Sequence, residues 1–322
     1  MSTPPSQPTH LTRGYTAALI SAGFLSTTAI FIRYLTQTYH LPAMVLACWR
    51  DFFVAFSLLP ILGIIRPRLL RVDRKHLVYL LAYGFLLAIF NSLWTVSVSL
   101  NGAAVSTVLA YCSAGFTALL GWWLLKERLD WGKVLAVTLS LAGCVLVSGA
   151  LNPAAWISNI LGILTGILSG LGYAIYTLMG RKASQDGLNP WTTLLYTFTF
   201  AAVFLLIANL TLGGRVPGAA AQPADLLWLG NQTAGWGILL LLAIGPTLAG
   251  FGLYNVSLVD LPSSVANLVV TLEPVFTAAI AYIVLKERLN SMQIVGSLLI
   301  LGGVIFLRIY EGHVSGSVLK SS

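Results

Sequence analysis

The sequence predicts an all-α integral membrane protein with ten transmembrane helices in two inverted five-helix repeats. Of its 322 residues, 57% are hydrophobic and only 9% are charged, whereas a soluble domain carries about 25% charged residues. Ten apolar runs are long enough to cross a hydrocarbon core of about 30 Å. A charged hexapeptide at 124–129 returns, nearly unchanged, at 284–289. A motif that recurs between apolar runs indicates an internal duplication.

The ten apolar runs are joined mostly by short connections. Loop 65–75 is basic, and loop 213–233 is rich in Gly, Ala and Pro. A polar tail at 1–13 precedes the first run, which is expected to be a retained span rather than a signal peptide. A polar and mobile tail is expected at 311–322. The expected spans are 14–35, 42–64, 76–98, 102–125, 132–150, 157–179, 191–212, 234–257, 261–285 and 292–310.

The placement of Lys and Arg predicts the orientation. With the N-terminus inside, thirteen of the 18 basic residues lie on the inner side, four lie outside, and Arg50 lies within a span. This bias follows the positive-inside rule. We therefore expect a multi-pass protein of the cell membrane with both termini in the cytoplasm. The net charge of +8 is then a result of membrane insertion and does not indicate a nucleic-acid partner.

The repeat can be followed residue by residue. Residues 91–147 align without a gap with 251–307, an offset of 160, and Gly14 pairs with Gly162 at an offset of 148. The spans in 14–150 thus return in 157–310. Since five is odd, the second half enters the membrane from the opposite side. Inverted repeats are typical of secondary transporters, although a duplicated bundle without a transport role remains the alternative.

Several motifs carry a family resemblance. Leu-Glu-Pro-Val at 272–275 leads into Leu-Lys-Glu-Arg-Leu at 285–289, a Gly-rich last span follows at 296–303, and Arg50 lies in span 2. Over residues 14–310 this pattern resembles the EamA family of the drug/metabolite transporter superfamily. The first half departs from it, with Ala114 in place of Pro274. The resemblance implies a carrier of amino acids, aromatic ones included, or of other small metabolites, often exported. It does not choose the substrate.

Two charged residues at membrane depth are candidates for coupling or gating. Such charges are costly and usually functional. Arg50 and Glu273 each lie about 12 Å from the outer face at 1.5 Å per residue, so we expect an Arg50–Glu273 ion pair. Asp51 points about 100° away from Arg50 on the helix and is not expected to pair with it face to face. A purely structural role for Arg50 is the alternative.

Glu273 is also the candidate for a proton-linked group, because a carboxylate in a low-dielectric cavity can carry a proton. Pro274 follows it and is expected to loosen the helix, since proline donates no backbone hydrogen bond. The alternative is that Glu273 caps this break or stays paired with Arg50.

Hydroxyl, amide and aromatic side chains within the spans could line a central cavity. Such a lining suits a small solute with an apolar or aromatic body. The alternative is that these groups join helices to one another, as polar residues commonly do in membranes. The candidate substrate-binding residues are Thr27, Thr28, Asn91, Trp94, Thr107, Tyr111, Tyr173, Tyr176, Tyr254, Asn267 and Thr271. Close helix packing is expected at Gly162, Gly166 and Gly170.

The sequence contains no H-E-x-x-H, G-x-S-x-G or Walker motif, and its three cysteines fit no zinc site. We therefore expect no enzyme activity, no metal and no cofactor. The predicted function is a secondary active exporter or exchanger of small metabolites, amino acids foremost. The expected partners are a small solute, the lipid bilayer and protons as a candidate coupling ion, as a monomer or a homodimer. An importer or facilitator of another solute, a membrane scaffold and an intramembrane enzyme are the alternatives.

The charged hexapeptide itself is expected to turn the chain. Its two copies fall on opposite membrane faces, so they cannot form one composite site. Glu127 and Glu287 are expected to bond nearby basic side chains or helix ends.

Overall fold

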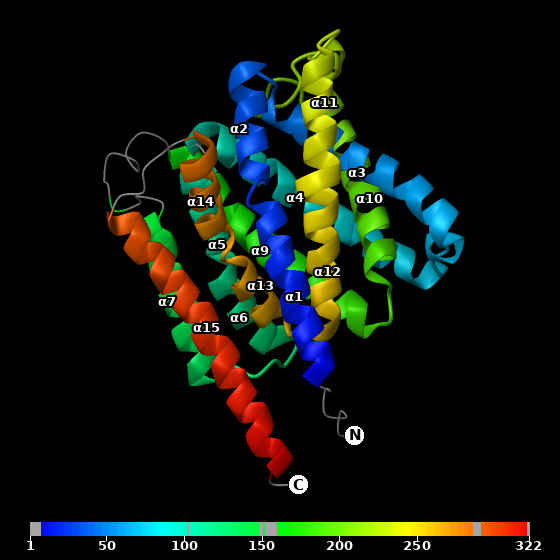
Figure 1. Cartoon of the computed structure of the whole chain (residues 1–322). Coiled ribbons are helices and arrows are strands. Elements are labelled where there is room, and N and C mark those ends of the chain that lie inside the picture. The colour runs from blue at the N-terminus through cyan, green and yellow to red at the C-terminus, as the bar shows by residue number, and fades with distance from the viewer. Residues whose placement is uncertain (1–7, 102, 148–150, 152–159, 286–290, 321–322) are drawn as a thin grey trace.

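The computed structural model describes residues 8–101, 103–147, 151, 160–285 and 291–320, and within these ranges the chain is a bundle of helices (Figure 1). Six helical segments are long and apolar enough to cross a membrane, by length and composition. They match predicted spans 1, 2, 3, 6, 7 and 8. The six segments are Leu11–Thr38, Ala43–Ile65, Arg74–Asn101, Ile160–Gln185, Pro190–Leu212 and Thr233–Asp260. Shorter apolar helices occupy spans 4, 5 and 10, at Leu109–Leu124, Trp131–Gly143 and Ile294–Leu307.

The first half of the chain supplies the elements α1 (Pro8–Leu25), α2 (Thr28–Thr38), α3 (Ala43–Ile65), η1 (Pro67–Leu70), α4 (Arg74–Asn101), α5 (Ala103–Tyr111), α6 (Ser113–Leu124) and α7 (Trp131–Val147). The second half supplies α9 (Ile160–Gln185), α10 (Pro190–Leu212), η2 (Pro223–Leu227), α11 (Thr233–Leu242), η3 (Ala243–Ala249), α12 (Gly250–Asp260), α13 (Ser263–Val270), α14 (Glu273–Leu285) and α15 (Ser291–Lys320).

The predicted tails need correction. The first helix begins at Pro8, inside the expected tail 1–13, and α15 continues to Lys320, so most of the tail expected at 311–322 is helical. The predictions for 148–150, 157–159 and the Glu287 loop fall on residues outside the described ranges.

Span 1 is interrupted at Ser26–Thr27, between α1 and α2. Both hydroxyls bond to carbonyls three residues back, Ser26 to Gly23 at 2.6 Å and Thr27 to Phe24 at 2.8 Å. Such local bonds compete with the helical ladder. The Ser26 carbonyl accepts a hydrogen bond from the Thr277 hydroxyl at 2.9 Å. The break is thus stabilised from another helix, as backbone at membrane depth requires.

Spans 4 and 9 break at equivalent positions. Helix α5 ends before Cys112 and α13 ends before Thr271–Leu272, and Cys112 and Leu272 are equivalent at offset 160. In span 9, Pro274 occupies the second position of α14, where a missing N–H costs little. The helix is therefore interrupted immediately before Glu273, and the loosening by Pro274 stays a prediction, since the equivalent break at Cys112 has no such proline.

Span 8 contains a π-helical segment, η3, around Pro246. Proline cannot donate to the carbonyl four residues back, which belongs to Leu242. The Thr247 hydroxyl donates to that carbonyl instead, at 2.8 Å. A π segment supported in this way is a typical source of a local irregularity in a helix.

The helices pack closely through glycines. A Cβ on Gly166 would lie 2.7 Å from Leu109, and one on Gly170 would lie 3.0 Å from the Ala110 carbonyl. The close packing predicted for Gly162, Gly166 and Gly170 is confirmed. Helices α7 and α15 run antiparallel, because Gly143 faces the Gly296 carbonyl while Gly303 faces the Ala136 carbonyl.

Candidate functional site

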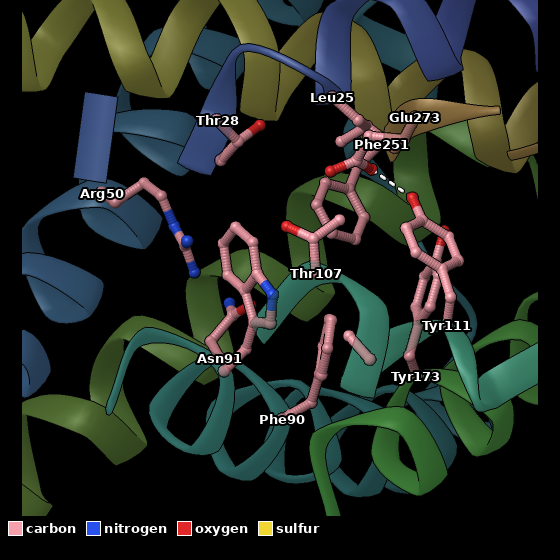
Figure 2. A pocket seen from close by; sticks show the side chains of 12 residues that line it. Leu25, Thr28, Arg50, Phe90, Asn91, Thr107, Tyr111, Tyr173, Phe251 and Glu273 are labelled. Atoms are coloured by element: carbon pink, nitrogen blue, oxygen red, sulfur yellow. Dashed lines mark hydrogen bonds between the residues drawn. The ribbon is translucent and has the colours of Figure 1, made fainter. Parts of the chain in front are cut away.

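A small cavity, mostly apolar but with charged side chains at its ends, lies where the helix interruptions meet. Leu25 and Thr28 flank the break in span 1, Tyr111 ends α5 and Glu273 begins α14. The remaining lining comes from α3, α4, α5, α9 and α12. The twelve residues are Leu25, Thr28, Arg50, Phe90, Asn91, Trp94, Thr107, Ala110, Tyr111, Tyr173, Phe251 and Glu273 (Figure 2). Irregular backbone at membrane depth is tolerated where it lines such a cavity.

The cavity has a volume of about 40 Å³. A water molecule needs roughly 10–15 Å³ on this scale, so there is room for a few waters. Pockets for organic ligands are typically about 300–1,000 Å³. The cavity is therefore too small for an organic solute in the conformation described.

Arg50 forms one polar end of the cavity. Its side chain is 1% exposed, and its Nε donates to the Asp51 carboxylate at 3.2 Å. Asp51 is fully buried and also accepts a hydrogen bond from the Asn91 amide at 2.7 Å. Arg50 Nη2 and the Thr28 hydroxyl are buried, and neither has a hydrogen-bond partner among the described residues. Since buried polar groups are nearly always bonded, these two atoms can bind a polar ligand or water.

Glu273 forms the other polar end. It is 7% exposed, and its carboxylate accepts a hydrogen bond from the Tyr111 hydroxyl. Figure 2 shows the Glu273–Tyr111 contact across the cavity from the Arg50 guanidinium. The first residue of a helix is a favourable place for a carboxylate, since the backbone N–H groups there lack partners.

The prediction of an ion pair between Arg50 and Glu273 is wrong. The two residues share a cavity, as their depth predicted, but Arg50 pairs with Asp51 and Glu273 with Tyr111. The helical angle between Arg50 and Asp51 misled the prediction, because it describes Cβ directions. A long arginine side chain can fold back so that its Nε reaches the carboxylate of its neighbour.

The predicted substrate-binding residues divide into two groups. Thr28, Asn91, Trp94, Thr107, Tyr111 and Tyr173 line the cavity together with Arg50 and Glu273. The others lie outside the lining in this conformation. The Thr27 and Thr271 hydroxyls bond to backbone carbonyls three residues back, in α1 and α13, and Pro274 lies beyond Glu273.

Tyr176, Tyr254 and Asn267 belong to a buried network between helices. The Tyr254 hydroxyl and the Thr177 hydroxyl are 2.7 Å apart, and the Asn267 amide donates to Thr177 at 3.3 Å. The Tyr176 hydroxyl donates to Asn255 at 3.3 Å. This network joins α9, α12 and α13, the arrangement expected of polar residues that hold membrane helices together.

Three lining residues were missed by sequence reasoning, Leu25, Phe90 and Ala110, whereas Phe251 is the repeat equivalent of the predicted Asn91. Phe90 stacks on Tyr173 with ring centroids 5.3 Å apart, and it adjoins Asn91 in the sequence. An apolar side chain inside a span gives no signal that separates a cavity wall from ordinary packing.

Glu127 of the first hexapeptide bonds a helix end, as expected. Its carboxylate accepts hydrogen bonds from the backbone and the hydroxyl of both Ser263 and Ser264, at the start of α13.

Comparison with known proteins identifies the family. The model of the EamA-like transporter family matches residues 12–149 and again 160–309. The chain belongs to the EamA-like transporter family. The resemblance stated from its motifs is therefore confirmed, and the chain is a transporter of the membrane rather than an enzyme.

Relatives within this family are distant. An uncharacterized transporter of Synechocystis is 28% identical, over 78% of this chain and 72% of its own length. The uncharacterized transporter YyaM of Bacillus subtilis is 26% identical, over 80% of this chain and 82% of its own length. A probable amino-acid metabolite efflux pump of Salmonella typhimurium is 24% identical, over 83% and 85%.

A solved protein structure has the same fold as this EamA-like chain. It is 16% identical, with a TM-score of 0.71, and the match covers 96% of this chain and 99% of the other.

Proposed function

We propose that this EamA-like protein is a secondary active transporter that exports or exchanges small metabolites, aromatic amino acids foremost. The observation that carries the proposal is the small cavity with Arg50 at one end and Glu273 at the other. Arg50 Nη2 would bind a carboxylate, and Glu273 would bind an ammonium group. The rings of Phe90, Trp94 and Phe251 would surround the apolar body of the solute.

The chemistry of a relative supports this substrate class. The Salmonella typhimurium protein is described as a probable amino-acid metabolite efflux pump. An amino acid carries both charges on one carbon and so matches a cavity that offers a cation donor at one end and a carboxylate at the other.

We propose further that the two halves are inverted about an axis in the membrane plane. Gly14 contacts Leu261. The repeat equivalents of these two residues, at offsets of 148 and 160, are Gly162 and Asn101, and they also contact each other. Likewise the contact of Gly143 with Gly296 becomes that of Gly303 with Ala136.

The packing direction supports the placement of this axis. Helices α7 and α15 are equivalent and antiparallel, so the two-fold axis that exchanges them is perpendicular to both. Both chain ends lie at the same end of the bundle (Figure 1), which supports ten crossings with the termini together, on the cytoplasmic side by the charge bias.

Alternating access follows from this symmetry. Two alike but inverted halves can exchange conformations, so a shape open to one side has a counterpart open to the other. The cavity of about 40 Å³ is then a closed intermediate, and a bound solute requires it to enlarge several-fold. Glu273 is the proposed proton-linked group, because its carboxylate is buried and faces the solute.

Counterflow in proteoliposomes tests the proposal. Vesicles loaded with one unlabelled amino acid should accumulate the same labelled amino acid when it is a substrate, with and without a pH gradient. Arg50→Met/Asp51→Asn, which removes both buried charges, should abolish accumulation while the protein stays folded. If no amino acid accumulated in any vesicle, the proposed substrate class would be wrong.

A further inference from the structure

A carboxylate of the first half closes over a helix end of the second half. Glu127 Oε1 accepts from the Ser263 backbone N–H at 2.8 Å and from its hydroxyl at 2.6 Å. Glu127 Oε2 accepts from the Ser264 hydroxyl at 2.9 Å and from its N–H at 3.3 Å. The residue before helix α13 is Pro262, whose side chain cannot accept a hydrogen bond, so within the described residues the helix start depends on Glu127 for a side-chain cap. We call this set of four hydrogen bonds the Glu127 cap.

The loop that carries Glu127 is shaped to make this contact. Lys126 has a positive φ of 56°, which residues with a side chain rarely adopt. The turn brings the Glu127 N–H to the Gly121 carbonyl at 3.1 Å. A Cβ on Gly121 would lie 3.0 Å from Glu127 Oε2 and 3.1 Å from the Ser263 hydroxyl, so glycine provides the space for the cap.

The same corner is held by two more contacts. Arg181 donates to the carbonyls of Leu258 and Val259, at 2.7 and 2.9 Å, and so fixes the end of α12. Arg13 pairs with Asp260 at 3.6 Å. The beginning of α1, the end of α9 and the loop after α6 therefore all meet the α12–α13 corner, at the end of the bundle where the N-terminus lies.

The sequence lacks the residues for a matching cap on the opposite side of the bundle. At offset 160, Ser263 and Ser264 correspond to Ala103 and Ala104, and Gly121 corresponds to Ala281. Glu287 is retained, but the sequence offers it no hydroxyl donors and no glycine at the position of close approach. A cap of this type can therefore form more hydrogen bonds on the N-terminal side of the bundle than on the opposite side.

We propose that the Glu127 cap is the gate that closes the transport pathway on the N-terminal side, and that the lack of matching hydroxyl donors on the other side biases the protein toward closure on the N-terminal side. This inference rests on the proposed inverted halves. Opening toward the N-terminal side requires α13 to leave Glu127. Hydrogen bonds to a charged group are strong, so loss of the two hydroxyl donors should shift the ratio of the two states about tenfold or more.

Hydrogen–deuterium exchange of the full chain in nanodiscs tests the gate without any substrate. The variant Ser263→Ala/Ser264→Ala should raise exchange in peptide 261–268 and lower it in the equivalent peptide 101–108. A second variant, Ala103→Ser/Ala104→Ser with Ala281→Gly, should build a cap on the other side and change both peptides in the same directions, because closure on that side favours opening on the N-terminal side. Ser99→Ala, which removes only a bond to the Val96 carbonyl in the same helix, is the matched control and should leave both peptides unchanged.

The two peptides together decide the outcome. Reciprocal changes support a gate, because only a coupled opening and closing connects the two faces. Faster exchange confined to 261–268 would mean that Glu127 only caps a helix. Unchanged exchange in both peptides would mean that the two hydroxyl hydrogen bonds do not stabilise the closed state. Either result overturns the proposal. Since no transport is measured, failure of the amino-acid hypothesis leaves this test intact.

Discussion

Removal of one charge from the Arg50–Asp51 pair should destabilise the protein far more than removal of both. Arg50 and Asp51 are buried, with side chains 1% and 0% exposed and 3.2 Å between Nε and Oδ1. Asp51→Asn keeps the volume but leaves the guanidinium as an uncompensated buried charge, at a cost of about 3–5 kcal/mol. For a chain of this size, this corresponds to a fall in Tm on the order of 10 °C.

The double variant Arg50→Met/Asp51→Asn removes both charges and should recover most of the lost stability while transport stays absent. The matched control is the exposed pair Lys182–Asp186, 2.7 Å apart with side chains 51% and 40% exposed. Its neutralisation should cost less than about 1 kcal/mol. Thermal unfolding in detergent, read by intrinsic fluorescence, measures all four proteins. If the double variant were no more stable than Asp51→Asn, the reasoning about a buried uncompensated charge would be refuted.

Three further predictions concern packing and the cavity. A Cβ on Gly143 would lie 2.5 Å from the Gly296 carbonyl, so Gly143→Ala should lower the free energy of unfolding by about 1–3 kcal/mol. The control Gly23→Ala, where a Cβ would meet no described atom within 4 Å, should raise it by about 0.5–1 kcal/mol. A lower Tm for Gly23→Ala than for Gly143→Ala would contradict the packing. Glu273→Gln should exchange solute without a gradient yet lose its response to an imposed pH gradient, and a full response would exclude Glu273 as the proton-linked group. Tyr111→Phe removes the donor to Glu273 and should raise the KM for phenylalanine about tenfold, with an unchanged KM as the refuting result.

The helical fold could be predicted because its signal is long and repeated. Apolar runs of about twenty residues have few interpretations, and the recurrence of Lys-Glu-Arg gave the duplication directly. The interruptions were harder. Pro274 predicted an irregularity next to Glu273. The breaks at Thr27 and Cys112 involve hydroxyl and backbone contacts that the sequence alone does not predict.

The sequence predicted which residues line the candidate site better than it predicted their hydrogen-bond partners. Arg50 and Glu273 were placed in one cavity because residues at the same depth of a narrow bundle lie close together. Their actual partners depend on side-chain reach, as with Asp51, and on a hydroxyl from another helix, as with Tyr111. The residues Tyr176 and Tyr254 had the same chemical character as the lining but face a buried interhelical network.

The most direct test of the transport proposal compares phenylalanine with the analogues that lack one charge. Binding to the purified protein in nanodiscs can be measured by calorimetry for phenylalanine, phenethylamine and phenylpropanoate. With Arg50 at one end of the cavity and Glu273 at the other, phenylalanine should bind at least about tenfold more tightly than either analogue, and Arg50→Gln should remove its advantage over phenethylamine. Equal affinities for all three compounds would contradict a cavity built to recognise both charges of an amino acid.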